Sequence, residues 1–180
     1  LNRSTFEKKL VSNIKYCLNG IGPIDVQRSQ GRIYIEPFDD NYNTDKAIEI
    51  LTRIFGIVSV TPAIKINSNF YDIKQTAFEL TKKSIECGRG NTFKVITKRG
   101  NKNFPMNSPE INSELGGYLL DSFKSLAVDV NNPSFVIYVE VREFTYLYTE
   151  IIQSHGGLPV GTNGKAMILL SGGINNPITT

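Results

Sequence analysis

The residues of this chain best suited to binding a ligand are four cations close together in the sequence, with no acidic residue among them: Lys94, Lys98, Arg99 and Lys102. Cations at this spacing can neutralise phosphate oxygens, as the binding of a nucleic-acid backbone requires. Residues 82–102 hold seven basic residues and one acidic residue, a net charge of +6, so the rest of the chain carries −3. This segregation predicts an anion-binding face. The alternative is a solvated turn whose lysines only keep the protein soluble.

A strand and the helix after it must position these cations. Apolar Phe93 and Val95 alternate with their neighbours, which predicts a strand with one packed face and one open face. Further along, Ser108 is a favourable N-cap residue and Pro109 is a favourable first helical residue. We therefore expect a strand, a basic turn and a helix that runs to about Ser125, with the cations at the rim of a rigid scaffold.

Residue types that serve catalysis or metal binding are scarce. His155 is the single histidine, and the two cysteines, Cys17 and Cys87, lie far apart without metal-type spacing. We assign no catalytic residue and no metal ligand. Both cysteines are expected to be free thiols, packed as small buried residues, in a reducing compartment. No apolar run is long enough to cross a bilayer and no signal peptide opens the chain, so we expect a cytoplasmic protein without a membrane partner.

The first third of the chain predicts an α+β unit. A four-residue recurrence of apolar side chains from Phe6 to Leu18 predicts a helix over 1–19. Pattern and turn residues then predict a strand, a strand, a helix and a strand over 24–27, 32–36, 44–53 and 57–66. Pro62 makes the last of these an edge or bulged strand. This order is that of a ferredoxin-like βαββαβ fold that lacks its first strand.

The middle of the chain predicts a second α+β unit, which begins after a polar link at 67–69. We expect a helix over 70–87, the basic strand from residue 92 and a second helix over 109–125. An antiparallel pair of strands should follow, over 135–141 and 144–150. Gly116 and Gly117 interrupt the second helix at a cost of about 1 kcal/mol each relative to alanine. We expect close helix–sheet packing there, or the close approach of a ligand.

The end of the chain changes character. Residues 155–161 are too rich in glycine for a regular element, whereas Ala166–Leu170 is a continuous apolar run of the kind that forms a buried parallel strand. Ser171, Gly172 and Gly173 follow it directly. Backbone N–H groups in such a turn can cradle a pyrophosphate. The strand has no sheet to join in this chain, so we expect the chain to be marginally stable beyond Gln153 unless a homodimer protects the strand.

Five further features occur in a fixed order. They are Asn2-Arg3 with Phe6-Glu7; Lys98-Arg99, Lys102 and Phe104-Pro105-Met106 followed by Ile111 to Gly116; Val128-Asp129-Val130 with Asn132-Pro133; Val139-Glu140-Val141-Arg142; and Gly156 to Thr162 followed by Leu169 to Ile174. Together they resemble the tRNA 4-thiouridine synthetase family, the tRNA sulfurtransferases that are also linked to thiamine thiazole synthesis. The resemblance covers essentially the whole chain, and the ordered set carries it because no single motif is specific.

The resemblance implies a ferredoxin-like domain at 1–66, a THUMP domain at 67–152, and a linker with the first strand of an α/β PP-loop ATP-binding domain at 153–180. It implies tRNA as the partner, with the THUMP domain taking the 3′ CCA end of the acceptor stem. It also implies ATP and Mg²⁺ as cofactors of the full-length enzyme and a cysteine desulfurase as the sulfur donor. By position, the residues that would touch ATP are Leu169, Leu170, Ser171, Gly172 and Gly173. For RNA contact, charge and placement select Lys94, Lys98, Arg99, Lys102 and Arg142.

The chain departs from the family at the nucleotide loop. The family reads SGGIDSPVA, whereas Asn175 and Asn176 stand here for the aspartate and the serine. The loss of a carboxylate weakens the hold on Mg-ATP, so we expect no tight ATP binding by this chain. Two interpretations stay open: a tRNA-binding module without chemistry of its own, such as a truncated or degenerate paralogue, and part of a nucleotide-using enzyme. A THUMP module of another RNA-modifying enzyme is a third.

Overall fold

The computed structural model describes residues 3–29, 31–162 and 164. The chain forms two compact units. The first unit contains the residues up to Val60 together with those from Gln153 onward, and the second unit is Thr61–Ile152. The predicted strand 166–170 and the predicted nucleotide loop 171–173 lie outside the described residues. Each unit has its own hydrophobic core, so each is described by itself.

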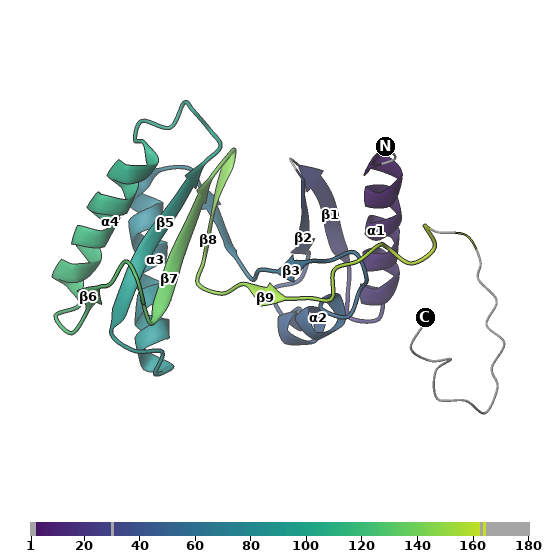
Figure 1. Cartoon of the computed structure of the whole chain (residues 1–180), viewed down its shortest axis with the longest axis horizontal. Coiled ribbons are helices and arrows are strands. Elements are labelled where there is room, and N and C mark those ends of the chain that lie inside the picture. Colours follow the sequence, from purple (N-terminus) through teal and green to yellow (C-terminus); the bar gives the residue numbers. More distant parts are fainter. Residues whose placement is uncertain (1–2, 30, 163, 165–180) are drawn as a thin grey trace. The chain divides into compact units, whose positions relative to one another are not determined.

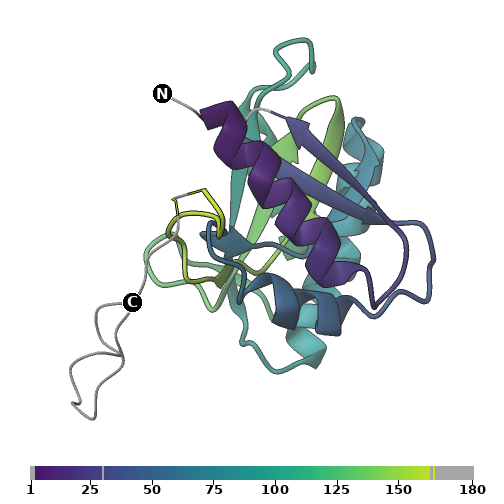
Figure 2. The same ribbon diagram turned by 90° about the vertical axis from the view of Figure 1, so that its right-hand side faces the viewer.

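The first unit has the predicted order of helix, strand, strand, helix and strand. Its elements are α1 (Arg3–Leu18), β1 (Ile24–Ser29), β2 (Arg32–Pro37), α2 (Thr44–Leu51) and β3 (Ser59–Val60). β1 and β2 pair antiparallel, with Gln27 opposite Tyr34, and α1 lies along one face of this hairpin (Figure 2). The core between them contains Ile14, Leu18, Ala47, Leu51 and Ile54, packed against apolar residues of the hairpin. The helix periodicity thus predicted the buried face of α1 correctly.

The predicted strand 57–66 is wrong as a single element. The structure has two strands there, β3 in the first unit and β4 (Ile64–Asn67) in the second, with Pro62 between them. Proline has no N–H to donate to a strand ladder, so the pairing of β3 cannot continue into β4. β3 instead pairs with β9 (Ile152–Gln153).

The second unit is a five-stranded sheet with both helices on one face (Figure 1). The strand order is β4-β8-β7-β5-β6, in which β5 (Thr92–Arg99) runs parallel to β7 (Phe135–Val141) and to the short β6 (Ala127–Val128). β8 (Phe144–Tyr148) is antiparallel to β7 and to β4, which confirms the predicted strand pair. The helices are α3 (Phe70–Glu86) and α4 (Ser108–Ser122).

Alternate residues of the central strands form the core of the second unit. Phe93, Ile137, Val139 and Leu147 are fully buried against α3 and α4. The intervening residues, Lys94 and Lys98 among them, therefore lie on the other face of the sheet, because successive side chains of a strand point to opposite faces. The alternation of the sequence predicted this division.

α4 begins one residue earlier than predicted. Asn107 is its N-cap: its side chain accepts a hydrogen bond from the Glu110 N–H at 3.0 Å, and the Glu110 carboxylate accepts one from the Asn107 N–H at 2.7 Å. Ser108 is the first helical residue and not the cap. These two reciprocal hydrogen bonds fix where the helix begins, because they require a glutamate or glutamine three residues after the N-cap, and Glu110 is three residues after Asn107.

The glycine pair in α4, Gly116 and Gly117, does not interrupt the helix. The helix continues through Gly116 and Gly117, and a Cβ placed at either position would meet no heavy atom within 4 Å. Gly116 is buried and Gly117 is exposed. α4 packs on the sheet through Ile111, Leu115 and Leu119, as expected. Outside α4, however, no backbone of the described chain approaches the two glycines closely, so this packing does not require glycine.

Within the part of the chain that the structure describes, no helix combines the length and apolarity that a bilayer crossing requires.

Candidate nucleic-acid interface

The turn that follows β5, residues 100–107, is tied firmly to the connection between β7 and β8. The Gly100 and Asn101 N–H groups donate to the Val141 carbonyl at 2.8 and 3.1 Å. The Asn101 side chain donates to the Arg142 carbonyl at 3.3 Å and accepts from the Asn103 N–H at 2.9 Å. With the Asn107 cap at its far end, the turn is ordered along its length and can present side chains in fixed positions.

Arg99 holds this turn from within. Its Nη1 donates to the carbonyls of Phe104 and Met106, at 3.3 and 3.2 Å, and its side chain is half-buried. Phe104 is itself buried in the core of the second unit. The guanidinium therefore bridges two carbonyls that no strand or helix would otherwise satisfy. Arg99 positions the turn, and its predicted contact with RNA stays a prediction.

Lys98 and Lys102 are the freely available cations of this region. Both side chains are exposed, and neither has a hydrogen-bond or ion-pair partner among the described residues. Lys98 is near the end of β5, and Lys102 is in the turn that Arg99 holds. Two solvated ammonium groups on a rigid frame suit phosphate oxygens, since neither has to give up an ion pair or hydrogen bond with another described residue when it binds.

Arg142 is engaged with a buried carboxylate. Its Nε lies 3.5 Å from Glu140 Oε2, and the Tyr148 hydroxyl donates to Glu140 Oε1 at 3.0 Å. The Glu140 side chain is only 4% exposed. A buried carboxylate needs such partners, because burial without them would cost several kcal/mol. The charge of Arg142 is thus shared with Glu140, and the predicted RNA contact of Arg142 also stays a prediction.

Lys94 lies apart from the other four predicted cations. It precedes Lys98 by four residues, roughly 13 Å along a strand. Its Nζ donates to the Val130 carbonyl at 3.3 Å. The residue before Val130 is Asp129, whose carboxylate accepts from the N–H groups of Asn132 and Asn131 at 2.9 Å each. These two hydrogen bonds, with a smaller contribution from the charge of Lys94, hold the pKa of Asp129 below its ordinary value. Lys94 therefore steadies the loop before β7.

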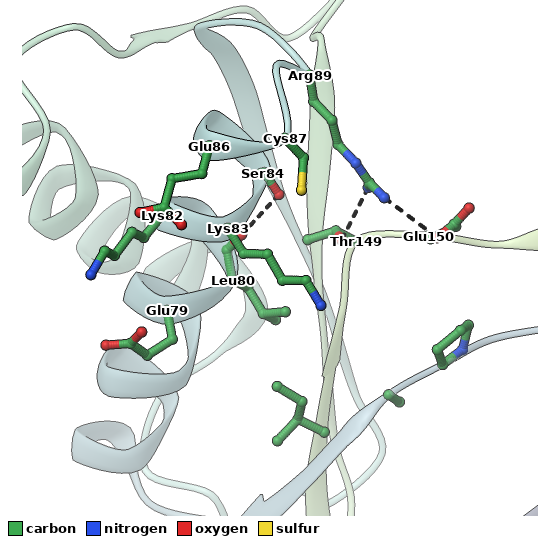
Figure 3. Close-up of a pocket in the computed structure, with 13 residues that line it drawn as sticks. Glu79, Leu80, Lys82, Lys83, Ser84, Glu86, Cys87, Arg89, Thr149 and Glu150 are labelled. Atoms are coloured by element: carbon green, nitrogen blue, oxygen red, sulfur yellow. Dashed lines mark hydrogen bonds and ion pairs between the residues drawn. The ribbon is translucent and has the colours of Figure 1, made fainter. Parts of the chain in front are cut away.

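A pocket of about 530 Å³ lies at the opposite end of the same sheet, beside the C-terminal end of α3 (Figure 3). Its lining comes from α3, from the connection to β5, and from the residues before β4 and after β8. Arg89 crosses one side of it, donating to the Thr149 hydroxyl at 3.3 Å and pairing with the Glu150 carboxylate at 3.4 Å. In the sequence, Lys82, Lys83 and Arg89 contributed only to the net charge of residues 82–102. The pocket that they line could not be predicted, because its walls are brought together by the order of the strands in the sheet.

Cys17, Cys87 and His155 are the cysteines and the histidine of the chain. Cys17 and Cys87 are free, as expected, but both are exposed, which corrects the prediction that they are buried. His155 stacks on Phe55 with ring centroids 6.0 Å apart. In the described ranges no group of three or more His, Cys, Asp or Glu residues is placed to hold a metal ion.

Comparisons with known proteins agree with this architecture. A family model described as a ThiI ferredoxin-like domain matches residues 1–61, and one described as a THUMP domain matches residues 67–150. A probable tRNA sulfurtransferase of Acetivibrio thermocellus is 54% identical over 99% of this chain and 45% of its own length. Another protein of that name, from Lachnoclostridium phytofermentans, is 48% identical over 98% of this chain and 45% of its own length.

The solved structures include a 4-thiouridine synthetase–RNA complex with bound ATP, which has a TM-score of 0.83 and 41% identity over 98% of this chain and 44% of that chain. The fold is thus that of a THUMP-domain protein with a ferredoxin-like domain before the THUMP domain. The chain belongs to the tRNA sulfurtransferase family, which confirms the resemblance drawn from the motifs. It spans about 45% of the length of the curated relatives that it matches.

Proposed function

We propose that this chain is the tRNA-binding part of an ATP-dependent tRNA sulfurtransferase that makes 4-thiouridine, and that it holds the acceptor stem and 3′ CCA end. The observation that carries the proposal is the rigid turn after β5, where Lys98 and Lys102 are exposed and have no ion-pair partner within the described part of the chain. The solved relative with RNA bound, at 41% identity, supports RNA as the ligand. The cations would contact phosphates, and the single-stranded end would add stacking or base-edge contacts.

The chemistry belongs to the complete enzyme in this proposal. ATP and Mg²⁺ are its cofactors, a cysteine desulfurase supplies the sulfur, and the site of action is the cytoplasm, with thiamine synthesis as a second role of the family. The residues assigned to ATP, 169–173, lie outside the described part of the chain. Because Asn175 and Asn176 replace the aspartate and serine of the family loop, we expect this chain to bind RNA without binding Mg-ATP tightly. Tight Mg-ATP binding would favour the alternative of a nucleotide-using enzyme.

The first experiment compares labelled tRNA with the same tRNA lacking its CCA end, at two salt concentrations. We expect weaker binding without CCA and a steep loss of affinity with salt, because phosphate contacts release counterions. Equal binding of both RNAs would leave a basic surface without specificity for the tRNA end, and would overturn the proposal for the CCA end.

The second experiment tests the two cations. Lys98→Ala with Lys102→Ala should weaken tRNA binding and lower the salt slope by about 2, one per lost phosphate contact. The matched control is Lys46→Ala with Lys124→Ala, which removes the same charge from exposed positions elsewhere. If the control weakened binding as much as the test variant, net charge and not the turn would account for affinity.

A further inference from the structure

The lining of the pocket beside α3 combines three basic side chains, three acidic side chains and an apolar wall. Figure 3 shows the Lys83 side chain reaching toward the strands and Arg89 crossing the pocket toward Glu150. Lys82, Glu79 and Glu86 also belong to the lining, but they extend from the other side of the helix in this view. Lys83 has no hydrogen-bond or ion-pair partner in the described part of the chain. Glu150 offsets the charge of Arg89 at 3.4 Å, so the inward-facing groups retain the charge of Lys83.

Apolar residues form the opposite wall. Pro62, Ala63 and Ile64 line the pocket from the strand side and Leu80 lines it from the helix side. Ile64 is 43% exposed, which leaves an open apolar surface next to the cations. The volume of about 530 Å³ lies in the range of pockets that hold small ligands. A ligand that combines an anionic group with a flat apolar body matches this lining, and a nucleotide of single-stranded RNA has both parts.

The position of the pocket relative to the basic turn also favours RNA. Arg89 precedes β5 and residues 100–107 follow it, so the two cationic regions lie at opposite ends of that strand. Eight residues of strand separate them by roughly 25 Å. Lys83 and Arg89 in the first region and Lys98 and Lys102 in the second all lie in the 82–102 window that carries a net charge of +6. One folded RNA can cover both ends, and charge of one sign along its path is what backbone tracking requires.

We propose that this pocket is a second RNA contact, separate from the turn after β5, in which Lys83 and Arg89 bind a backbone phosphate and the adjoining nucleotide lies against Leu80 and Ile64. The inference rests on the proposed function, since it requires that tRNA binds. Thr149 and Glu150 hold Arg89 in place, so its guanidinium is positioned before RNA arrives. Aliphatic side chains make van der Waals contact with the face of any base and do not read its edge, so this contact would add affinity without sequence preference.

Cys87 gives a direct test, because its exposed thiol lines the pocket. Alkylation of Cys87 by a small thiol reagent is followed by mass spectrometry, with and without saturating tRNA. We expect tRNA to slow the modification of Cys87 several-fold at low salt, and high salt that releases the RNA to restore the original rate. Cys17, also exposed but in the first unit, is read in the same sample as a measure of general crowding by RNA.

A pair of neighbouring lysines provides the matched variants. Lys83→Ala should weaken tRNA binding and lower the salt slope by about 1, whereas Lys82→Ala, whose side chain extends from the other side of the helix in Figure 3, should leave the slope unchanged. Lys83 also lies in the last turn of α3, where a cation stabilises the helix end. The thermal stability of each variant is therefore measured, and Lys83→Arg, which keeps the charge, should retain binding.

The outcomes separate the two proposals. If wild-type protein binds tRNA but Cys87 stays fully reactive and the two lysine variants behave alike, the pocket inference is overturned and the proposed function survives. If wild-type protein does not bind tRNA at all, both fail.

Discussion

Lysine and arginine have different roles at the end of β5, although both supply positive charge. Lys98 and Lys102 project into solvent, while the guanidinium of Arg99 spans the carbonyls of Phe104 and Met106. Sequence alone predicted a basic cluster there, because charge and spacing are visible in the residues. It could not predict which cation holds the turn, since that depends on the path of the backbone between Gly100 and Asn107.

The role of Arg99 can be tested by Arg99→Lys, which keeps the charge and removes the planar fork. A single ammonium group satisfies two separated carbonyls less well, so we expect faster amide exchange over 100–107 and weaker tRNA binding with an unchanged salt slope. Lys98→Arg is the conservative control and should alter neither quantity. Equal exchange and equal affinity in Arg99→Lys would show that Arg99 acts by charge alone.

At the scale of the elements, helices and strands were predicted correctly where a few neighbouring residues determine them. The alternation over β5 and β7 and the four-residue recurrence of α1 are properties of a few neighbouring residues, and these elements formed where expected. The break at Pro62 was also visible, yet only the pairing of β4 with β8 shows that it separates two units. Likewise the pocket is lined both by α3 and by residues after β8, which are far apart in the sequence, so no local pattern could predict it.

The glycine pair of α4 gives a prediction at this scale. Gly117 is exposed, helical and surrounded by open space at its Cβ position, so Gly117→Ala should raise the free energy of unfolding of the second unit by about 1 kcal/mol. Urea unfolding measures the change, and tRNA affinity should stay constant. A loss of affinity with intact stability would mean instead that RNA approaches this helix closely, as the sequence first suggested.

At the scale of the whole molecule, the chain leaves the first unit after Val60 and returns to it at Gln153. The returning segment, residues 154–162, is not a loose linker. Ser154 donates to the Val58 carbonyl at 2.9 Å, Gly156 donates to Ile57 at 2.8 Å and accepts from Gly56 at 2.6 Å. Farther on, the Asn13 side chain donates to the Val160 carbonyl at 3.2 Å. Composition predicted an irregular segment here, and the structure adds that it is fastened to α1 and to the region before β3.

A substitution at Gly56 should disturb the attachment of residues 154–162 to the first unit. The φ of Gly56 is +100°, and an added Cβ would lie 2.8 Å from Cγ of the buried Pro159. Gly56→Ala should therefore destabilise the first unit by about 1–3 kcal/mol. Hydrogen exchange should become faster over 52–60 and 153–162 together, because each segment supplies partners for the other.

The second unit provides the control for this experiment. Gly88 also has a positive φ, +70°, but a Cβ there would meet nothing within 4 Å, so Gly88→Ala carries backbone strain without a clash. It should leave exchange over 153–162 unchanged, and Gly56→Ala should leave α4 and β5 unchanged. If residues 153–162 already exchange at the rate of an unprotected peptide in the wild-type chain, the hydrogen bonds that join them to residues 56–58 do not persist in solution, and the segment is a linker after all.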